Sequence, residues 1–142
     1  MKELVIAAKQ ENLDAVLDFV AGALEGSGCP DDTQVMIGIA VEELFVNIAH
    51  YAYAQSGGEG GAVIRVSVGD QVSIEFEDDG IPYNPLLRDD PDIEASFEER
   101  QIGGLGIHMV KHFMDQVEYT YAGGKNKLQI TKNITAEVQD GS

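Results

Sequence analysis

The segment IRVSVGDQVSIEFE, residues 64–77, alternates apolar and polar side chains on both sides of Gly69-Asp70. Isoleucine and valine alternate with arginine and serine before the glycine; valine, isoleucine and phenylalanine alternate with serine and glutamate after it. A period of two residues is typical of a strand with one buried face, and Gly-Asp is a frequent hairpin turn. The segment therefore predicts a β-hairpin in a sheet that is covered on one face.

Helical patterns lie on both sides of this hairpin. Apolar residues recur at spacings of three and four, and Asn12 and Pro30 stand at the expected helix starts. The expected order is a strand over 4–7, a helix over 13–24, a helix from Pro30 that ends by Gln55, the hairpin, a long loop over 78–104, a helix from Leu105, and strands over 117–121 and 128–134. This order predicts an α+β fold with helices layered on one face of a mostly antiparallel sheet.

Composition predicts one acidic domain that spans residues 1–142. Nine Lys and Arg against 25 Asp and Glu give a net charge of -16. Nucleic acids and anionic membranes attract a cationic face, so this charge argues against both as direct partners. The single cysteine, Cys29, excludes an internal disulfide, the N-terminus lacks a signal-peptide pattern, and no apolar run approaches the roughly 20 residues of a membrane span. We therefore expect a soluble, cytoplasmic protein.

Glu43 and Asn47 lie four residues apart in the second predicted helix, so they share one helix face. A carboxylate beside a carboxamide orients a water or hydroxyl and holds a hard divalent cation, since Mg²⁺ prefers oxygen ligands. A plain hydrogen bond on the helix surface explains the same pair, and an acidic chain contains many such pairs. The pair alone leaves a functional site and a surface contact both open.

The run Asp78-Asp79-Gly80-Ile81-Pro82 follows directly on the second strand of the hairpin. A carboxylate at a strand end accepts a hydrogen bond from an exocyclic amine such as that of adenine, and Gly80 allows backbone or ligand to approach closely. Asp-Gly is also a common turn pair, so an ordinary turn accounts for this run equally well.

Glycines surround the start of the third predicted helix, at Gly103, Gly104 and Gly106. Glycines at a helix N-terminus leave backbone N–H groups open to an anion, which suits phosphate. The run is not a P-loop, because no Gly-Lys-Ser/Thr follows, and it is not a dinucleotide fingerprint, because a loop precedes it. A flexible hinge that leads into the helix is the alternative.

The order of these three motifs resembles that of the GHKL ATPase superfamily, which includes gyrase, heat-shock chaperones, histidine kinases and mismatch-repair proteins. Within that superfamily, four segments resemble those of the bacterial anti-sigma-factor serine kinases. These segments are VEELFVN (41–47), DDGIPYNP (78–85), GLGI (104–107) and NKLQITK (126–132). The resemblance covers nearly the whole chain, and the motifs keep their order and approximate spacing.

The resemblance implies the Bergerat fold, a two-layer α/β sandwich that holds ATP and Mg²⁺. It implies that Glu43 is the general base and that Asn47 holds Mg²⁺. It also implies that Asp78 reads the adenine amine with the help of Gly80. The other nucleotide contacts that it implies are Pro82, Gly103, Gly104, Leu105 and Gly106.

Residues 86–104 correspond to the ATP lid of the family. Between Leu86 and Glu99 this segment carries six acidic residues against Arg88. Carboxylates repel a triphosphate, so we expect the acidic middle to face solvent or a partner. Arg100 is the lid cation nearest to the glycines and is a candidate phosphate contact.

The resemblance further implies an ATP-dependent serine/threonine protein kinase. Such a kinase phosphorylates a small anti-anti-sigma protein and sequesters a sigma factor when free, and a homodimer is possible. Two alternatives stay open: a module that uses ATP as a switch without catalysis, and a kinase whose partner is unrelated to sigma factors. The presence of both Glu43 and Asn47 argues against the switch without catalysis. Nothing in the sequence distinguishes a kinase with an unrelated partner from one that acts on a sigma-factor pathway.

Overall fold

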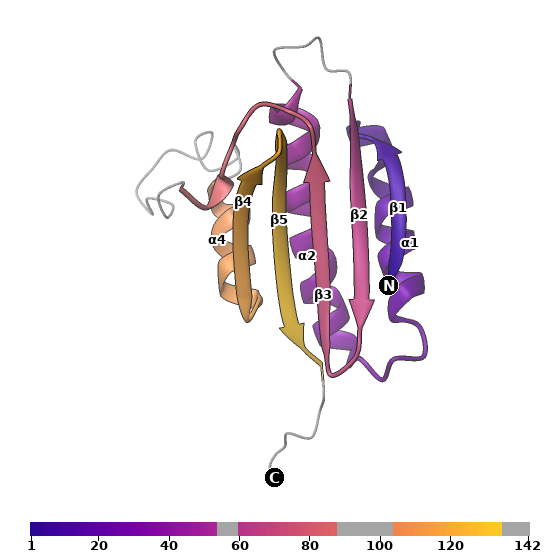
Figure 1. Ribbon diagram of the computed structural model, residues 1–142. Helices are drawn as coiled ribbons and strands as arrows, with labels where there is room; N and C mark the ends of the chain where they lie inside the picture. Colours follow the sequence, from indigo (N-terminus) through magenta and orange to yellow (C-terminus); the bar gives the residue numbers. More distant parts are fainter. Residues whose placement is uncertain (54–59, 88–103, 135–142) are drawn as a thin grey trace.

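The computed structural model describes residues 1–53, 60–87 and 104–134. Its elements confirm the predicted order along the chain (Figure 1). The longer elements are β1 (Lys2–Ala7), α1 (Leu13–Leu24), α2 (Asp31–Asn47), β2 (Gly61–Val68), β3 (Gln71–Asp78), α4 (Gly104–Phe113), β4 (Gln116–Ala122) and β5 (Lys125–Asn133). Short helical turns join some of them: η1 (Gln10–Asn12), η2 (Ile48–Ala52) and η4 (Pro85–Leu87).

The strands form one five-stranded sheet in the order β1-β2-β3-β5-β4, with every neighbouring pair antiparallel. The predicted hairpin is confirmed, because Ile64 lies opposite Phe76 across β2 and β3. The last strand, β5, inserts between β3 and β4. This insertion places Asn126, near the start of β5, directly opposite Asp78 at the end of β3.

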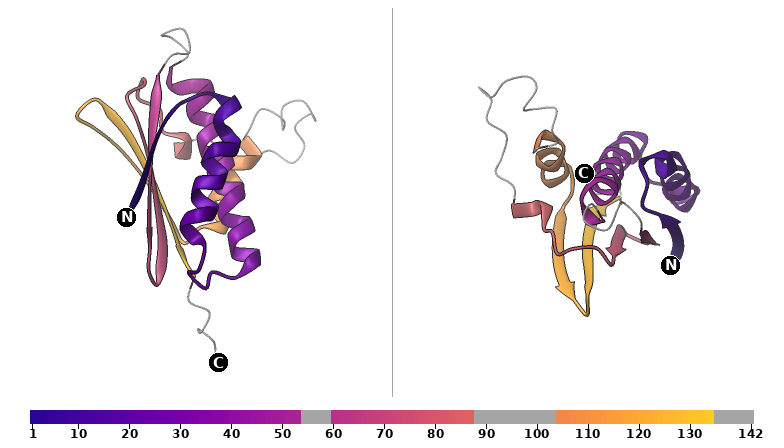
Figure 2. Two further views of the ribbon diagram at one scale, coloured as in Figure 1. Left: turned by 90° about the vertical axis from the view of Figure 1, so that its right-hand side faces the viewer. Right: turned by 90° about the horizontal axis from the view of Figure 1, so that it is seen from above.

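Within the described residues, the helices α1, α2 and α4 cover the same face of the sheet, as the two views in Figure 2 show. The inward residues of the hairpin form the floor of the core under these helices, and each is at most 1% exposed. They are Ile64, Val66, Val72, Ile74 and Phe76. The predicted two-layer α+β sandwich is confirmed. Its physical basis is the alternation of the hairpin, which gives the sheet one apolar face.

The central helix α2 has an apolar stripe that is buried in the core. Ile37, Val41 and Phe45 are at most 1% exposed. Asp31 and Asp32 lie in its first turn, where carboxylates interact favourably with the helix dipole. The segment Asp31–Ala52 is long and apolar enough to cross a membrane by length and composition, but here it is the core helix of the sandwich.

The helix α1 begins at Leu13, directly after the predicted cap residue Asn12. The predicted position of Asn12 at the helix start is confirmed, although its side chain makes no hydrogen bond to the helix. Its Nδ2 donates instead to the Ala7 carbonyl at 2.9 Å. The short helical turn η1 leads into α1, and the side-chain amide of Asn12 is hydrogen-bonded to the last residue of β1.

Candidate functional site

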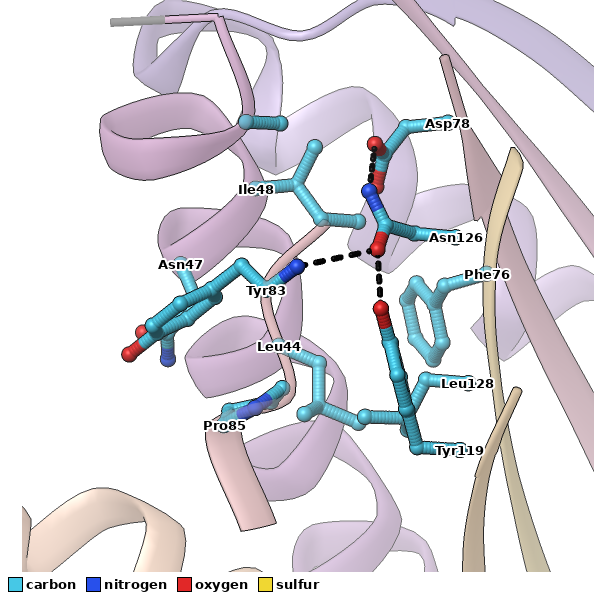
Figure 3. Close-up of a pocket in the computed structure, with 11 residues that line it drawn as sticks. Leu44, Asn47, Ile48, Phe76, Asp78, Tyr83, Pro85, Tyr119, Asn126 and Leu128 are labelled. Atoms are coloured by element: carbon cyan, nitrogen blue, oxygen red, sulfur yellow. Dashed lines mark hydrogen bonds between the residues drawn. The ribbon is translucent and has the colours of Figure 1, made fainter. Parts of the chain in front are cut away.

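A cavity opens at the end of the fold where α2, β3 and β5 come together (Figure 3). The space between its walls is about 410 Å³ when the solvent at its open mouth is counted. Its apolar walls are Leu44, Ile48, Ala52, Phe76, Pro85 and Leu128, and its polar lining is Asn47, Asp78, Tyr83, Tyr119 and Asn126. Apolar walls with a few converging polar groups are typical of a small-molecule site.

Asp78 is the only carboxylate among the described residues that line this cavity, and it is 6% exposed. Its Oδ1 accepts hydrogen bonds from the Gly80 N–H at 2.8 Å and from Asn126 Nδ2 at 2.9 Å. Within residues 1–53, 60–87 and 104–134, no hydrogen bond reaches its Oδ2. Burial raises the pKa of the carboxyl group above its usual range, although both hydrogen bonds act in the opposite direction. One carboxylate oxygen is therefore fixed while the other keeps its acceptor capacity.

Asn126 holds this arrangement together, and sequence reasoning missed its role. Its Nδ2 also donates to the Ile81 carbonyl at 2.8 Å, and its Oδ1 accepts from the Tyr83 N–H at 3.1 Å and from the Tyr119 hydroxyl (Figure 3). One amide thus connects β5, β4 and the loop after β3. The available signal was strand parity: Asn126 shares the inward face with Leu128, where a polar residue is costly unless it is hydrogen-bonded.

Glu43 and Asn47 lie on adjacent turns of α2, as predicted. Asn47 Nδ2 donates to both the Glu43 carbonyl and Glu43 Oε2, each at 2.8 Å. Asn47 is 6% exposed, and no hydrogen bond occupies its Oδ1 within the described residues. An amide oxygen is an acceptable Mg²⁺ ligand, and Mg²⁺ commonly takes one or two protein oxygens together with substrate phosphates. The donor set therefore fits the ion.

The start of α4 packs directly against this pair. A Cβ on Gly106 would overlap the carboxylate of Glu43, so any larger residue here would require the Glu43 side chain to move. The glycine motif and the Glu43–Asn47 motif are 60 residues apart in the sequence, and the packing of α4 on α2 brings them together. The first turn of α4, whose N-terminal end favours anions, thus stands beside a carboxylate and an amide oxygen.

Gly80 permits a close approach, but its neighbour in the structure is the protein backbone. A Cβ at Gly80 would overlap the carbonyl of Ala52, and the next residue, Ile81, donates its N–H to that same carbonyl at 3.0 Å. This contact joins the loop after β3 to the end of η2. Gly80 therefore shapes the cavity wall through its contact with Ala52.

We expect Gly80→Ala to lower the melting temperature, because the added methyl group meets backbone that must move. Overpacking of this kind costs about 1–3 kcal/mol of unfolding free energy. Gly38→Ala is the matched control, since a Cβ at Gly38 meets nothing within 4 Å. Thermal unfolding of both variants followed by circular dichroism checks this. Equal melting temperatures for the two would contradict the close approach.

The other predicted site residues are placed less centrally or lie outside the described residues. Pro82 is exposed and does not line the cavity, whereas Pro85 is buried and does. Gly104 and Leu105 form the first turn of α4. Arg100 and Gly103 lie outside the described residues, as does most of the predicted lid over 86–104.

Comparison with the sequence profiles of known families gives the same assignment as the motif order. The profile of the family described as "Histidine kinase-like ATPase domain" matches residues 6–132. This chain belongs to that family. The GHKL membership predicted from the motifs is thereby confirmed, and the match includes all the site residues described above.

Similar members of the histidine kinase-like ATPase family are named as kinases. Serine/threonine-protein kinase BtrW of Bordetella bronchiseptica is 31% identical over 67 residues, which are 47% of this chain and 47% of that protein. Serine-protein kinase RsbW of Bacillus mycoides is 28% identical over 142 aligned positions, covering 95% of this chain and 86% of that protein.

Solved structures share the fold. The RsbU and RsbW domains of a Mycobacterium tuberculosis protein align with a TM-score of 0.63 at 12% identity, over 100% of this chain and 35% of that one. A chain of the SiaB–SiaC complex from Pseudomonas aeruginosa aligns with a TM-score of 0.56 at 10% identity, over 93% of this chain and 89% of that one. At these identities the likeness concerns the fold alone.

Proposed function

We propose that this protein is an ATP-dependent serine/threonine protein kinase that transfers the γ-phosphate of ATP to a hydroxyl group of a small partner protein. One observation carries the proposal: Glu43 packs against Gly106 and is hydrogen-bonded to Asn47, which lines the same cavity as Asp78. This arrangement supports a single nucleotide that would meet a base-reading carboxylate, a metal ligand, a proton acceptor and a helix N-terminus. The names of BtrW and RsbW support the same activity.

Adenine is the part of the nucleotide that the cavity suits. Its ring would lie between the apolar walls, and its exocyclic amine would donate to Asp78 Oδ2, which has no hydrogen bond within the described residues. The phosphates would extend towards the first turn of α4, where backbone N–H groups favour anions. Asn47 Oδ1 would hold Mg²⁺, which, when bound, neutralises charge on the phosphates.

Glu43 would act as the general base. Its Oε2 accepts a hydrogen bond from Asn47 Nδ2 at 2.8 Å, and its carboxylate lies where a Cβ on Gly106 would stand. Glu43 would take the proton of the acceptor hydroxyl as the hydroxyl oxygen bonds to the γ-phosphorus. The bond from that phosphorus to the bridging oxygen breaks, and ADP leaves. The neutral hydroxyl needs such a base only during transfer.

Residues 86–104 would form the lid of this site, and the acidic part of that segment would contact a protein partner. We propose an anti-anti-sigma protein as the phosphate acceptor and a sigma factor as the second partner. RsbW is named a serine-protein kinase, which supports a protein as the acceptor, and the fold relative from the SiaB–SiaC complex is likewise bound to another protein. A homodimer and a cytoplasmic location are part of the same proposal.

Nucleotide preference tests the proposal. We expect Mg²⁺–ATP to bind at least about tenfold more tightly than Mg²⁺–GTP, because Asp78 accepts from the adenine amine and repels the guanine carbonyl. A site built for one hydrogen-bond pattern rejects the wrong base strongly. Isothermal titration calorimetry of the full chain measures both affinities. Equal affinities would overturn the assignment of Asp78.

Phosphotransfer is the second arm of this test. The full chain is incubated with ATP labelled on the γ-phosphate and the candidate anti-anti-sigma protein from the same organism, and the acceptor is mapped by mass spectrometry. We expect a phosphoserine or phosphothreonine on that protein. Tight ATP binding without any transfer would instead indicate a nucleotide-dependent switch.

A further inference from the structure

The hydroxyl group of Tyr83 is a buried polar group without a partner. Among the described residues it is the side-chain atom that is enclosed by protein and has no hydrogen bond. Buried polar groups are nearly always hydrogen-bonded, because the hydrogen bonds that they lose to water are otherwise not replaced. A phenylalanine would fill almost the same volume without this cost. The described residues supply no partner for this hydroxyl, whereas a bound ligand would supply one.

The position of Tyr83 is fixed at both ends. Its backbone N–H donates to Asn126 Oδ1 at 3.1 Å, and its ring packs on Tyr51 with centroids 5.2 Å apart. Tyr51 follows Asn47 by one turn along α2 and η2. Figure 3 shows the Tyr83 ring extending from the loop after β3 towards the turn of α2 that carries Asn47. The hydroxyl thus lies on the Asn47 side of the cavity, away from Asp78.

The chemistry of the cavity indicates what this hydroxyl binds. Among the described residues, those that line the cavity include no lysine and no arginine, so the donors that they offer a phosphate group are neutral. Asn47 Nδ2 is already used, because it donates to Glu43. The Tyr83 hydroxyl is a donor without a protein acceptor, on the side of the cavity where the phosphates and Mg²⁺ would lie.

We propose that Tyr83 is a nucleotide-binding residue whose hydroxyl donates a hydrogen bond to a phosphate oxygen of the bound nucleotide. This inference rests on the proposed function. It assigns separate tasks to two parts of the cavity. Asp78, positioned by Asn126, recognises the base, and Tyr83 recognises that a phosphate is attached to it. Its stacking on Tyr51 keeps the hydroxyl in place before the nucleotide arrives.

The test is Tyr83→Phe, which removes only the hydroxyl. Calorimetry of the full chain with Mg²⁺–ATP and with adenosine separates the two parts of the ligand. We expect ATP affinity to fall about 10- to 100-fold, which is the usual effect of losing a hydrogen bond to a charged group. Adenosine affinity should stay unchanged. The melting temperature of the free protein should be equal or slightly higher, since an unpartnered polar atom is gone.

Tyr119→Phe is the matched control, because the Tyr119 hydroxyl lines the same cavity but already donates to Asn126. It should lower the melting temperature and weaken adenosine and ATP equally. Equal ATP affinity of Tyr83→Phe and the unmodified chain would overturn the inference, as would equal losses for ATP and adenosine. If the unmodified chain binds neither ligand, the proposed function fails as well, and this outcome is distinct from the other two.

Discussion

Replacing Glu43 by glutamine should lower phosphotransfer by roughly 10²–10⁴-fold, the usual contribution of a general base, while ATP binding stays nearly constant. Glutamine has the shape of glutamate and keeps an oxygen that accepts from Asn47 Nδ2, a bond that is 2.8 Å long in the structure. It also preserves the packing against Gly106. What glutamine lacks is the negatively charged carboxylate that takes up the proton. The loss should therefore appear in the rate of transfer and not in affinity.

Single-turnover transfer to the partner protein measures the rate, and calorimetry with Mg²⁺–ATP measures binding. Glu42→Gln is the matched control: Glu42 is the neighbouring residue on α2, is exposed, and does not line the Asp78 cavity. The control should transfer phosphate at the normal rate. Normal transfer by the Glu43 variant would exclude Glu43 as the base, and loss of ATP binding would show that its role is to position the nucleotide.

Replacing Asp78 by asparagine should weaken ATP binding about 10- to 100-fold, because the adenine amine loses a charged acceptor. An asparagine at this position satisfies the same protein donors only if its Oδ1 faces Gly80 and Asn126, the two partners of the present Oδ1. Its Nδ2 then faces the ligand amine, and two donors repel each other. Calorimetry with ATP detects the loss, and unchanged affinity would exclude Asp78 as the base-reading group.

The substitution Asp78→Asn should leave the nucleotide-free protein equally stable or more stable, and the size of this effect should depend on pH. Burial raises the pKa of Asp78 above 3.8, so the folded state favours the protonated form relative to the unfolded chain. The stability that this group contributes is present below 3.8 and is lost as pH rises through the raised value. The gain in melting temperature from Asp78→Asn should therefore be larger at pH 7 than near pH 4.

Thermal unfolding of both proteins across this pH range provides the measurement. Asp70→Asn is the control, since Asp70 is exposed in the turn between β2 and β3. Its effect on the melting temperature should be small at every pH. A loss of stability in the Asp78 variant that grows with pH would contradict the burial argument and would indicate that the carboxylate stabilises the fold.

The site was only partly accessible from the sequence. Residues on one helix could be paired, because four residues make one helical turn, and Glu43 and Asn47 do share a face with a hydrogen bond between them. Contacts between segments that are distant in the sequence could not be predicted in this way. The approach of Gly106 to Glu43 and of Gly80 to Ala52 depends on how helices and loops pack, and neither leaves a periodic signal in the chain.

Local chemistry established the secondary structure, the order of the elements, the single covered face of the sheet and the motifs of the family. Alternation with a period of two, helical spacing and glycine turns are properties of neighbouring residues, so they are legible in the sequence. Tertiary packing alone established that Asn126 links Asp78 to Tyr83 and Tyr119, because β5 inserts beside β3. The orphaned Tyr83 hydroxyl likewise exists only in the folded chain, since burial and the loss of partners are produced by elements that meet in space.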